Sequence, residues 1–507
     1  MGIVAGLDSS SGYTRIVVCD TDTGAVLRQG CAPHPSEPGQ GEDTAGGRKR
    51  TEIDPQLWLM SLGEAATGGV LEGVQAIGVS AQQHGLVPLD ADGSLVRPAL
   101  LGNDKRAQSA AADLVDALGG RTAWAEAVGC VPTAAQPVAK LRWLARNEPE
   151  SAQRTAVVLQ PHDWLVWQLL GRPPRQTTDR GGASGTGYWS AATGAYRPDL
   201  VELALGRPVA LPDVLGPSEP AGTTPEGLLI SAGTGETMAA SFALGVGLGD
   251  VVVSLGASGS IFAVHHAPLA DSTGTITSFA DATGMHLPVV HTLNAVRVLR
   301  GTAELLGTDL DGLSALALKS TPGSHGLVLL PYLEGERTPY LPHTAGTLAG
   351  LRRESMKPEH LARAAFEGML CGLADALDVL RGRGVQAGGA PGEAGGRVFL
   401  LGGAAELPAV QALAPAILGA QVIVPQAADY AAIGAARQAA WALGVAQGTL
   451  SPQQPPLWQG PSVQVFDPGT GEATGEPGAD LAVGQAVRQQ FASVREETHP
   501  GAFTRSG

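Results

Sequence analysis

The sequence predicts an α/β protein made of two similar lobes, and three observations support this fold class. The first is a strand–turn–strand unit near the N-terminus, where the apolar run 3–8 and the return strand 14–20 flank a turn rich in Ser and Gly. The second is a similar unit in the middle of the chain, at 251–264. The third is the length of 507 residues, which exceeds one ordinary hydrophobic core. Because turn amides can bind phosphate oxygens, the repeated unit indicates a nucleotide held between the lobes.

Composition excludes several classes of protein. Hydrophobic residues make up 44% of the chain and charged residues 16%, and no apolar run approaches the roughly 20 residues of a membrane span. The formal net charge of −15 argues against a nucleic-acid surface and gives no reason to expect binding to anionic membranes. The N-terminus lacks the basic segment and apolar core of a signal peptide. Cys19, Cys31, Cys130 and Cys371 are scattered without metal-ligand spacing, which predicts reduced thiols in a cytoplasmic protein.

The first half of the chain, taken in order, alternates strand and helix patterns. The stretch 33–51, rich in Gly, Pro and charge, is predicted to be a loop with a solvated basic cluster, Arg48-Lys49-Arg50. Asp54-Pro55 opens a helix, because proline suits a first turn. The other expected elements are strands at 74–80, 86–90, 100–101 and 157–160, a turn at 90–93, helices at 138–147 and 163–170, and a polar Gly-rich loop at 177–187 that is long enough to cover a site. The first domain is expected to end near Gly245.

Polar side chains follow two of these strands, at the end where α/β folds place ligands. Gln83 and His84 come after strand 74–80 and are candidate contacts of a sugar. A polar turn that bonds its own backbone explains them about equally well. Asp104 follows strand 100–101, within a second set of convergent polar groups.

The stretch 231–264 carries two candidate functional features close together. Its first turn is rich in Gly and ends in the carboxylate of Glu236, a candidate base. Its second turn, 256–259, is a candidate phosphate loop, although a plain hairpin is the simpler explanation of one Gly-Ser turn. The expected elements around these turns are a helix at 238–244 and strands at 251–255 and 261–264.

The second half predicts another α/β domain and a C-terminal tail. The turn 402–405 joins a strand to a helix, a geometry that lets helix amides bind a phosphate but is also the commonest way to join the two. The expected elements are strands at 327–332, 397–401 and 422–425, a charged loop at 334–339, and helices at 360–380, 410–418 and 432–443. We expect domains at 1–245 and 246–450, then a Pro- and Gly-rich, partly ordered tail at 451–507 with one helix near 482–495.

Several motifs, in order, resemble the FGGY carbohydrate kinases over about residues 1–445, most closely the xylulokinases among them. Asp8-Ser9-Ser10 is similar to the family's first phosphate motif, and Gln82-Gln83-His84-Gly85 is similar to the xylulokinase sugar motif. Residues 137–147 fit the first family signature except at its start, and 346–367 fit the second. Together these motifs are far more specific than any one of them.

The resemblance implies an actin–hexokinase type of fold, with two ribonuclease-H-like domains and ATP with Mg²⁺ in the cleft between them. It implies an ATP-dependent sugar kinase, with D-xylulose as the expected substrate and Glu236 as the base. Asp8 would hold Mg²⁺, and Gln83, His84 and Asp104 would bind the ketose. The residues expected at the phosphates and the nucleotide are Ser9, Ser10, Thr14, Arg15, Gly256, Ser258, Gly259, Gly402, Gly403 and Ala404. A small-molecule sugar and ATP are the expected partners, and a homodimer is left open.

This sequence departs from the family's pattern at or near the cleft. Glu236 stands where the family has its catalytic Asp, and Arg15 where a Lys is expected. Gly102 replaces the usual Trp before Asn-Asp, and 181–183 reads Gly-Gly-Ala where the family has Ser-Asp-Ala. The turn 402–405 reads Gly-Gly-Ala-Ala in place of Gly-Gly-Gly-Ala. We hypothesise that Gly102 opens space that lets Glu236 reach the sugar. The alternatives are a catalytically weak paralogue that binds sugar or nucleotide, and a kinase for another ketose or polyol.

Overall fold

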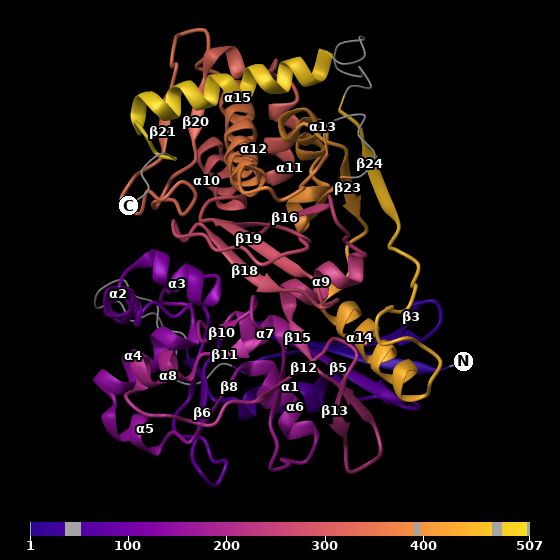
Figure 1. Cartoon of the computed structure of the whole chain (residues 1–507). Coiled ribbons are helices and arrows are strands. Elements are labelled where there is room, and N and C mark those ends of the chain that lie inside the picture. Colours follow the sequence, from indigo (N-terminus) through magenta and orange to yellow (C-terminus); the bar gives the residue numbers. More distant parts are fainter. Residues whose placement is uncertain (1, 36–51, 390–395, 469–478, 504–507) are drawn as a thin grey trace.

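The computed structural model describes residues 2–35, 52–389, 396–468 and 479–503, and these form two α/β domains placed one above the other in Figure 1. Most of the predicted loop 33–51, with the cluster Arg48-Lys49-Arg50, lies outside the described residues. Within the described ranges, every helix is too short or too polar to span a bilayer.

The N-terminal sheet is built around two buried strands, β1 and β5. Strand β1 pairs with β5 in parallel and with β2 in antiparallel, so Asp8 of β1 lies between Ser80 and Arg15. The order across the sheet is β13-β14-β5-β1-β2-β3, and β15 pairs with β5. The bounds are β1 Ile3–Ser9, β2 Tyr13–Asp20, β3 Val26–Pro33, β5 Ala76–Ala81, β13 Pro220–Thr223, β14 Leu229–Ser231 and β15 Thr234–Gly235. The predicted first strand–turn–strand unit is confirmed.

Helices cover this sheet and form a helical extension beside it. Trp58 of α1 (Gln56–Ala65) is fully buried and packs edge-on against Trp164 of α6 (Pro161–Leu169), with ring centroids 5.9 Å apart. In the extension, Leu141 and Leu144 of α4 lie in a second core, because helical spacing puts them on one face. The remaining bounds here are α2 Gln108–Ala117, α3 Arg121–Val128, α4 Pro137–Asn147, α5 Pro149–Arg154, α8 Pro198–Leu205, β4 Glu52–Ile53, β6 Val87–Leu89, β7 Ala99–Leu100, β8 Val157–Leu159, β10 Trp189–Ser190 and β11 Ala195–Tyr196.

The C-terminal sheet has the order β18-β19-β17-β16-β22-β23-β24. Strands β16 and β22 are parallel neighbours at its centre, while β16 and β17 form the second predicted strand–turn–strand unit. The long helix α12 lies against this sheet and supplies much of a large apolar core, including Phe366 and Leu373. The bounds are β16 Val251–Leu255, β17 Gly259–Ala263, β18 Ile276–Ala280, β19 His286–Thr292, β20 Val328–Leu330, β21 Thr347–Ala349, β22 Val398–Leu401, β23 Val422–Pro425, β24 Val463–Phe466, α9 Glu236–Leu244, α10 Val296–Leu306, α11 Leu310–Ala317, α12 Pro358–Gly382 and α13 Pro408–Leu418.

Helix α14 (Tyr430–Ala446) follows the C-terminal sheet in sequence but packs on the N-terminal sheet, as its orange ribbon beside the indigo strands shows (Figure 1). Gln438 donates to the Gly233 carbonyl and accepts from Ser231 Oγ, both at 3.0 Å. An added Cβ at Gly6 would lie 1.8 Å from the Ala432 carbonyl oxygen, so this close approach needs glycine. The helix therefore joins the two domains into one packed unit.

The stretch 177–187 is not the covering loop that its composition predicted. It contains strand β9 (Thr177–Asp179), which pairs with β12 (Asp213–Leu215), and the short buried helix α7 (Arg180–Ser184). The Asp179 carboxylate caps α7 by accepting from the amides of Gly181 and Gly182 at 2.9 and 2.7 Å. An aspartate that caps a glycine-rich turn can start a helix even where glycine disfavours one.

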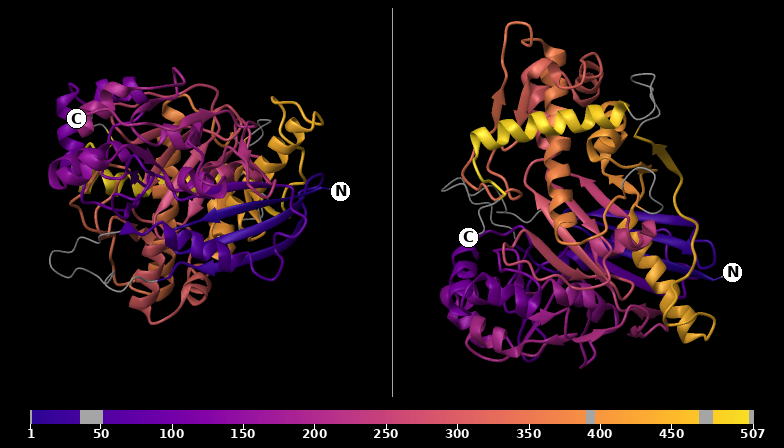
Figure 2. Two further views of the ribbon diagram at one scale, coloured as in Figure 1. Left: turned by 90° about the horizontal axis from the view of Figure 1, so that it is seen from below. Right: turned by 45° about the horizontal axis from the view of Figure 1, so that its top comes forward.

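The described residues after 451 contact both domains: Trp458 Nε1 donates to the Thr21 carbonyl of the N-terminal domain at 2.9 Å, and the elements that follow belong to the C-terminal domain. Strand β24 pairs with β23 at the edge of the sheet, and the predicted helix is α15 (Ala479–Thr498). Figures 1 and 2 show α15 lying across α12 at the outer side of the domain. Its Val487 and Phe491 are buried in the main core, which explains why a Pro- and Gly-rich segment ends in an ordered helix.

Candidate active site

The carboxylates of Asp8 and Glu236 come together at one edge of the N-terminal sheet. Asp8 of β1 lies opposite Ser80 of β5, and Ser80 lies opposite Thr234 of β15. Glu236 begins α9 two residues after Thr234. Because these strands run parallel, their carboxyl ends meet at the edge where α/β sheets bind ligands.

Both carboxylates bind protons more tightly than ordinary acids. Asp8 is 8% exposed, and its Oδ1 accepts from Ser80 Oγ at 2.8 Å. Burial and the charge of Glu236 raise the pKa of Asp8 to about 7, against the opposing effects of Ser80 and Arg15. Burial also raises the pKa of Glu236. Buried, interacting carboxylates of this kind are typical of functional sites, and a raised pKa suits a general base.

The hydroxyls of the first turn contact His34, a residue that the sequence did not indicate. Thr14 Oγ1 lies 3.0 Å from His34 Nε2, and Ser9 Oγ lies 3.5 Å from the same atom. The amide and hydroxyl of Ser10 both donate to the Tyr13 carbonyl, at 3.0 and 3.1 Å. The exposed tip of the turn is the part that remains open for phosphate oxygens.

Arg15 forms an ion pair with Asp429, which immediately precedes α14. Its guanidinium also stacks over the Tyr13 ring, 4.4 Å from the centroid. The expected phosphate contact therefore has a protein partner in this structure, and that partner comes from the distant end of the chain.

Gln83 lies beside the candidate base. An added Cβ at Gly235 would lie 2.8 Å from Gln83 Cγ, so the Gln83 side chain covers the residue that precedes Glu236. Gln83 Nε2 also lies 3.4 Å from the sulfur of Met238 on α9. The structure thus brings the predicted sugar motif and the predicted base together.

His84 lies where the two domains meet. Its backbone adopts a left-handed φ of 64°, and its Nδ1 donates to the Gly185 carbonyl at 2.9 Å. Its ring contacts Phe279 of the C-terminal sheet, with centroids 5.6 Å apart. Burial lowers the pKa of His84 to about 4, so the neutral ring presents Nε2 as a hydrogen-bond acceptor.

Lys140 supports the sugar motif from α4. It is fully buried, and its Nζ donates to the carbonyls of His84 and Ala135, the latter at 2.7 Å. Burial lowers the pKa of Lys140 to about 7, although the charge of Asp104 opposes this shift. Asp104 itself is 2% exposed and accepts from the amide and Nε of Arg106, both at 2.8 Å. A sugar bound at Asp104 would share the carboxylate with Arg106.

Gly102 does not leave open space, so the hypothesis built on it is wrong. An added Cβ at Gly102 would lie 2.6 Å from the Gln83 carbonyl oxygen and 3.5 Å from His84 Cβ. The backbone of the sugar motif fills the space that a larger residue would need. Gly182 is similarly enclosed, because an added Cβ would lie 2.5 Å from His162 Cε1.

The two predicted nucleotide turns of the C-terminal domain lie side by side. The turn after β16 is exposed at its first three residues, whereas Gly259 is buried and its amide donates to Thr292 Oγ1 at 3.2 Å. Gly402 has a φ of 101°, and an added Cβ would lie 2.5 Å from the Leu255 carbonyl oxygen. Gly403 is exposed and Ala404 is buried. The exposed backbone of both turns could therefore contact one ligand.

Sequence reasoning missed four residues that the structure brings to this site, namely Ser80, His34, Lys140 and Asp429. Lys140 had the clearest signal, because a single lysine within the apolar pattern of α4 indicates a buried ammonium. Strand register places Ser80 beside Asp8, and a contact between distant parts of the chain places Asp429 beside Arg15. His34 contacts the hydroxyls on either side of the first turn. None of these three relationships follows from spacing along the chain.

Mg²⁺ fits the donors at the carboxylate pair. Asp8 and Glu236 supply hard oxygen atoms, and proteins usually hold Mg²⁺ through one or two carboxylates, waters and substrate phosphates. Across the described ranges, no group of three or more His, Cys, Asp or Glu side chains gathers as a set of metal ligands. The chemistry of the donors thus matches an ion shared with a nucleotide.

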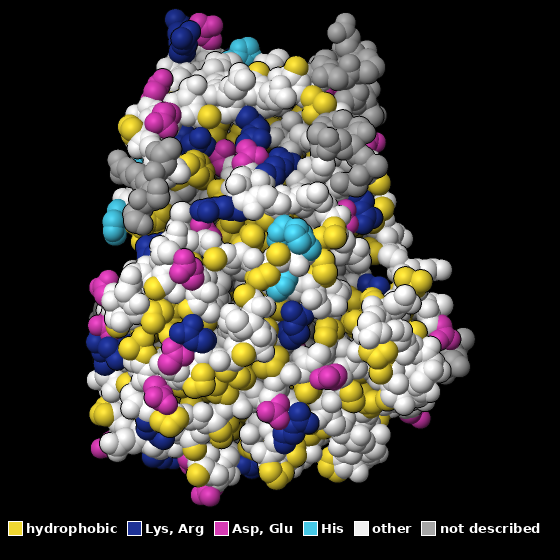
Figure 3. All heavy atoms as spheres, viewed as in Figure 1, with side chains coloured by type: hydrophobic (Ala, Val, Ile, Leu, Met, Phe, Trp, Pro, Cys, Tyr) yellow, Lys and Arg dark blue, Asp and Glu magenta, His cyan; other side chains and the backbone are white. Residues whose placement is uncertain are grey.

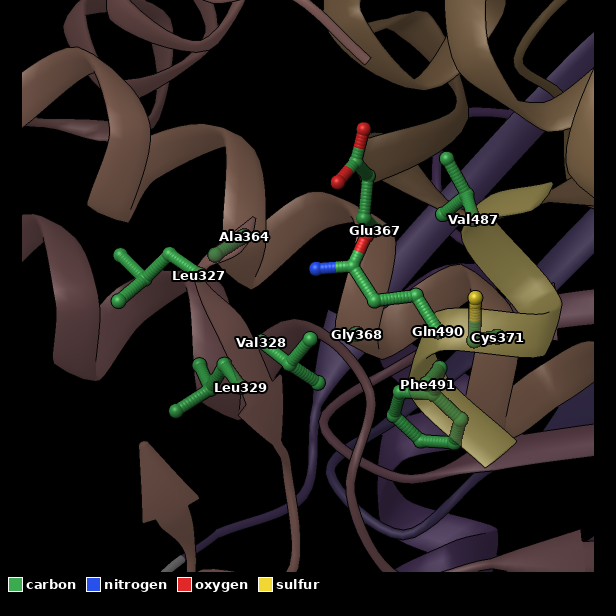
Figure 4. A pocket seen from close by; sticks show the side chains of 10 residues that line it. All are labelled: Leu327, Val328, Leu329, Ala364, Glu367, Gly368, Cys371, Val487, Gln490 and Phe491. Atoms are coloured by element: carbon green, nitrogen blue, oxygen red, sulfur yellow. The ribbon is translucent and has the colours of Figure 1, made fainter. Parts of the chain in front are cut away.

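A separate small pocket lies between β20, α12 and α15 (Figure 4). Its volume of about 10 Å³ admits about one water molecule. Glu367, Cys371 and Phe491 are among its lining residues, and none of the predicted site residues is. On the face seen in Figure 3, acidic and basic side chains are interspersed.

The fold and the site together define a two-domain kinase with an actin-like fold. Residues 3–255 match the N-terminal domain of the FGGY family of carbohydrate kinases, and residues 251–443 match its C-terminal domain. The chain belongs to the FGGY family of carbohydrate kinases, and kinases of this family use ATP. The predicted family and fold class are confirmed.

Similar proteins agree with this assignment. The chain is 40% identical over 448 residues to a xylulose kinase of Streptomyces coelicolor, covering 86% of this chain and 87% of that one. It is 27% identical over 463 residues to a xylulose kinase of Haemophilus influenzae, covering 87% and 90%. Its fold resembles the crystal structure of a xylulose kinase from Bifidobacterium adolescentis, with a TM-score of 0.84, 36% identity, and coverage of 97% and 99%.

Proposed function

We propose that this protein transfers the γ-phosphate of ATP to D-xylulose, giving D-xylulose 5-phosphate. The observation that carries the proposal is the contact between Gln83 of the sugar motif and the residue preceding Glu236, beside Asp8. It puts an acceptor-binding motif next to a carboxylate whose pKa is raised. The identity to named xylulose kinases over most of the chain supports D-xylulose as the acceptor.

Each group has a role in positioning or proton transfer. Glu236, in the position of the usual catalytic Asp, takes the proton of the attacking sugar hydroxyl, because its raised pKa makes it a stronger base than a surface carboxylate. Gln83, His84 and Asp104 bind the other sugar oxygens and fix the hydroxyl in line with the phosphate. Closure of the domains excludes water from the reaction.

The nucleotide lies across the turns from both domains. The turn backbones near Ser9, Ser10 and Thr14, together with Gly256, Ser258 and Gly259, bind the phosphates, and Gly402, Gly403 and Ala404 contact the remainder of the nucleotide. Asp8 holds Mg²⁺ directly or through water. When bound, Mg²⁺ offsets charge on the phosphates.

The decisive experiment measures sugar-dependent ADP release with ATP and Mg²⁺ across D-xylulose, other ketoses, polyols and aldoses. Turnover on D-xylulose with the largest kcat/KM supports the proposal. Turnover restricted to another sugar overturns the substrate and keeps the mechanism. Glu236→Gln keeps the shape and removes the base, so we expect it to lower kcat by about 10²- to 10⁴-fold while nucleotide binding persists.

A catalytically weak binding protein is the second candidate, and the residue at 236 favours it. The glutamate adds one methylene to the expected aspartate, and a displacement of about 1 Å can cost about a hundredfold in rate. Sugar- or ATP-dependent thermal stabilisation without turnover on any sugar would establish this role and reject the first.

A further inference from the structure

Hydrogen bonds join the loop between β20 and β21 to the end of β19 on both sides of Arg337. On one side, Thr338 Oγ1 donates to the His291 carbonyl at 2.9 Å. On the other, the Glu336 carboxylate accepts from the amides of Leu293 and Asn294. The backbone at Arg337 therefore has a fixed place relative to the C-terminal sheet.

The guanidinium of Arg337 forms no ion pair among the residues that the structure describes, although the charge of Glu336 acts on it, and its side chain is exposed. The neighbouring carboxylate of Glu336 is already occupied, because it also accepts from Asn294 Nδ2 at 2.9 Å and from the Arg337 amide at 2.7 Å. A cationic group with several donors is thus left available to a ligand.

Arg337 lies at the interface between the domains. Alternate side chains of β19 face the same way, so His291 points to the same side as Leu287 and Val289, which pack in the core shared with the N-terminal domain. The His291 ring is held by Ser260, whose Oγ lies 2.9 Å from Nδ1. Burial lowers the pKa of His291 to about 3, and the charges of Arg337 and His84 add to this effect.

His84 contacts Phe279 of β18, and Phe279 pairs with Leu287 of β19, so His84 lies against the same face of these two strands as His291. Arg337 also lowers the pKa of His84, the imidazole of the sugar motif.

We propose that Arg337 of the C-terminal domain is a sugar-binding residue that contacts the acceptor beside His84. The inference rests on the proposed function. Guanidinium groups only donate, so they suit the carbonyl oxygen of a ketose, which only accepts. The contact also means that the acceptor site is complete only when the two domains are together.

The C-terminal helix braces this loop. His499, directly after α15, places Nε2 3.2 Å from Thr344 Oγ1 in the loop, and its ring packs against Tyr332 with centroids 5.8 Å apart. Helix α15 is held in turn by the ion pair of Arg495 with Asp375 on α12. The tail therefore contributes to the position of Arg337 without touching the site.

The experiment compares Arg337→Met and Arg337→Lys with the unaltered protein, and Arg300→Met, an exposed arginine on α10, is the control. Steady-state kinetics give KM for D-xylulose and for ATP, and calorimetry without ATP gives Kd for D-xylulose and for xylitol, which lacks the carbonyl. Loss of a charged hydrogen bond is worth about 10- to 100-fold in affinity. We expect Arg337→Met to raise KM and Kd for D-xylulose by that factor, Arg337→Lys to raise them less, and KM for ATP to stay within about twofold.

An unchanged Kd for D-xylulose in Arg337→Met would overturn the inference. So would equal losses for sugar and ATP accompanied by a lowered Tm, because these indicate a loop that has lost its fold. If the unaltered protein binds D-xylulose without turnover and Arg337→Met loses that binding, the proposed function fails and the inference stands. If the unaltered protein binds neither D-xylulose nor xylitol, the proposed function and the inference about Arg337 both fail.

Discussion

The ammonium group of Lys140 donates a hydrogen bond to the backbone carbonyl of His84. His84 has a left-handed φ, which costs free energy for any residue other than glycine and persists only when its surroundings hold it. A second bond from Lys140 to Ala135, at 2.7 Å, ties this carbonyl to the chain segment before α4. Lys140 therefore holds the backbone of the sugar motif at His84.

Lys140→Met removes these bonds while keeping most of the side-chain volume. We expect KM for the sugar to rise about tenfold and KM for ATP to change little, because the nucleotide turns are elsewhere. The unaltered protein should also gain stability as pH rises from about 7 towards 10, because burial lowers the pKa of Lys140 to about 7 and the unfolded chain then holds the extra proton. Lys140→Met should lose that gain, as thermal unfolding across pH would show. Lys105→Met, at an exposed position, is the control and should match the unaltered protein.

Asp8 predicts a pH dependence of the opposite sign. Its pKa is raised from 3.8 to about 7, so between these values the folded chain holds a proton that the unfolded chain has lost. Stability without Mg²⁺ should fall as pH rises from about 4 to 7, by at most about 4 kcal/mol for a shift to about 7. Asp8→Asn should flatten this slope in denaturant titrations. An equal slope in both proteins would show that another group causes it.

Glu236→Asp tests whether the site has adapted to glutamate. Glu236 is the first residue of α9 and its charge acts on Asp8, so we expect a shorter side chain to move the carboxylate away from the acceptor hydroxyl. We expect kcat to fall by up to about a hundredfold, with KM for ATP unchanged. A large increase in kcat would instead show that glutamate impairs this enzyme.

The ion pair of Arg15 with Asp429 predicts an effect on nucleotide affinity. If Arg15 must leave Asp429 to reach a phosphate, Asp429→Asn should lower KM for ATP severalfold, whereas Arg15→Met should raise it about tenfold. The sugar KM is the internal reference, and it should stay constant in both variants. An increase in KM for ATP in both variants would mean that the pair itself organises the nucleotide site.

Gly6→Ala tests the packing of α14 on β1. The added methyl would meet the Ala432 carbonyl oxygen at 1.8 Å and the Ala436 amide at 2.5 Å, and both atoms belong to the helix backbone. We expect a loss of about 1–3 kcal/mol or more in the free energy of unfolding. Gly63→Ala, where nothing lies within 4 Å in α1, is the matched control and should stabilise the protein by about 0.5–1 kcal/mol.

The sequence was sufficient for many of the helices and strands and for the residues that carry motifs, but it led to no prediction for β18, β19, α10 and α11. Asp8, Gln83 and His84 follow strands with clear periodicity, and turn chemistry located the two strand–turn–strand units. Composition misled at 177–187, because it does not show that Asp179 caps a helix there. After residue 451, the predicted helix near 482–495 is confirmed as α15, whereas the apolar residues that dock it on the core are few.

The remaining site residues could not be predicted, because their roles come from contacts between distant parts of the chain. The position of Lys140 beneath His84, and of Arg337 beside it, depends on how α4 and the C-terminal sheet pack. Gly102 is an expectation that failed for the same reason. The sequence shows that the usual Trp is missing, but only the structure shows that the Gln83 carbonyl lies where the Cβ of a larger residue would be.

The crossing of α14 also constrains how this protein can be made. The face of the first sheet that holds Val4 and Ala76 is covered by Ala432, Ala436 and Ala439 of this helix. On the ribosome, Val4 and Ala76 of β1 and β5 emerge more than 350 residues before Ala432 of their cover. We therefore expect this apolar face of the nascent N-terminal domain to stay exposed until nearly the whole chain has been synthesised. A fragment ending near residue 245 should aggregate or recruit chaperones, and supplying α14 in trans should rescue it.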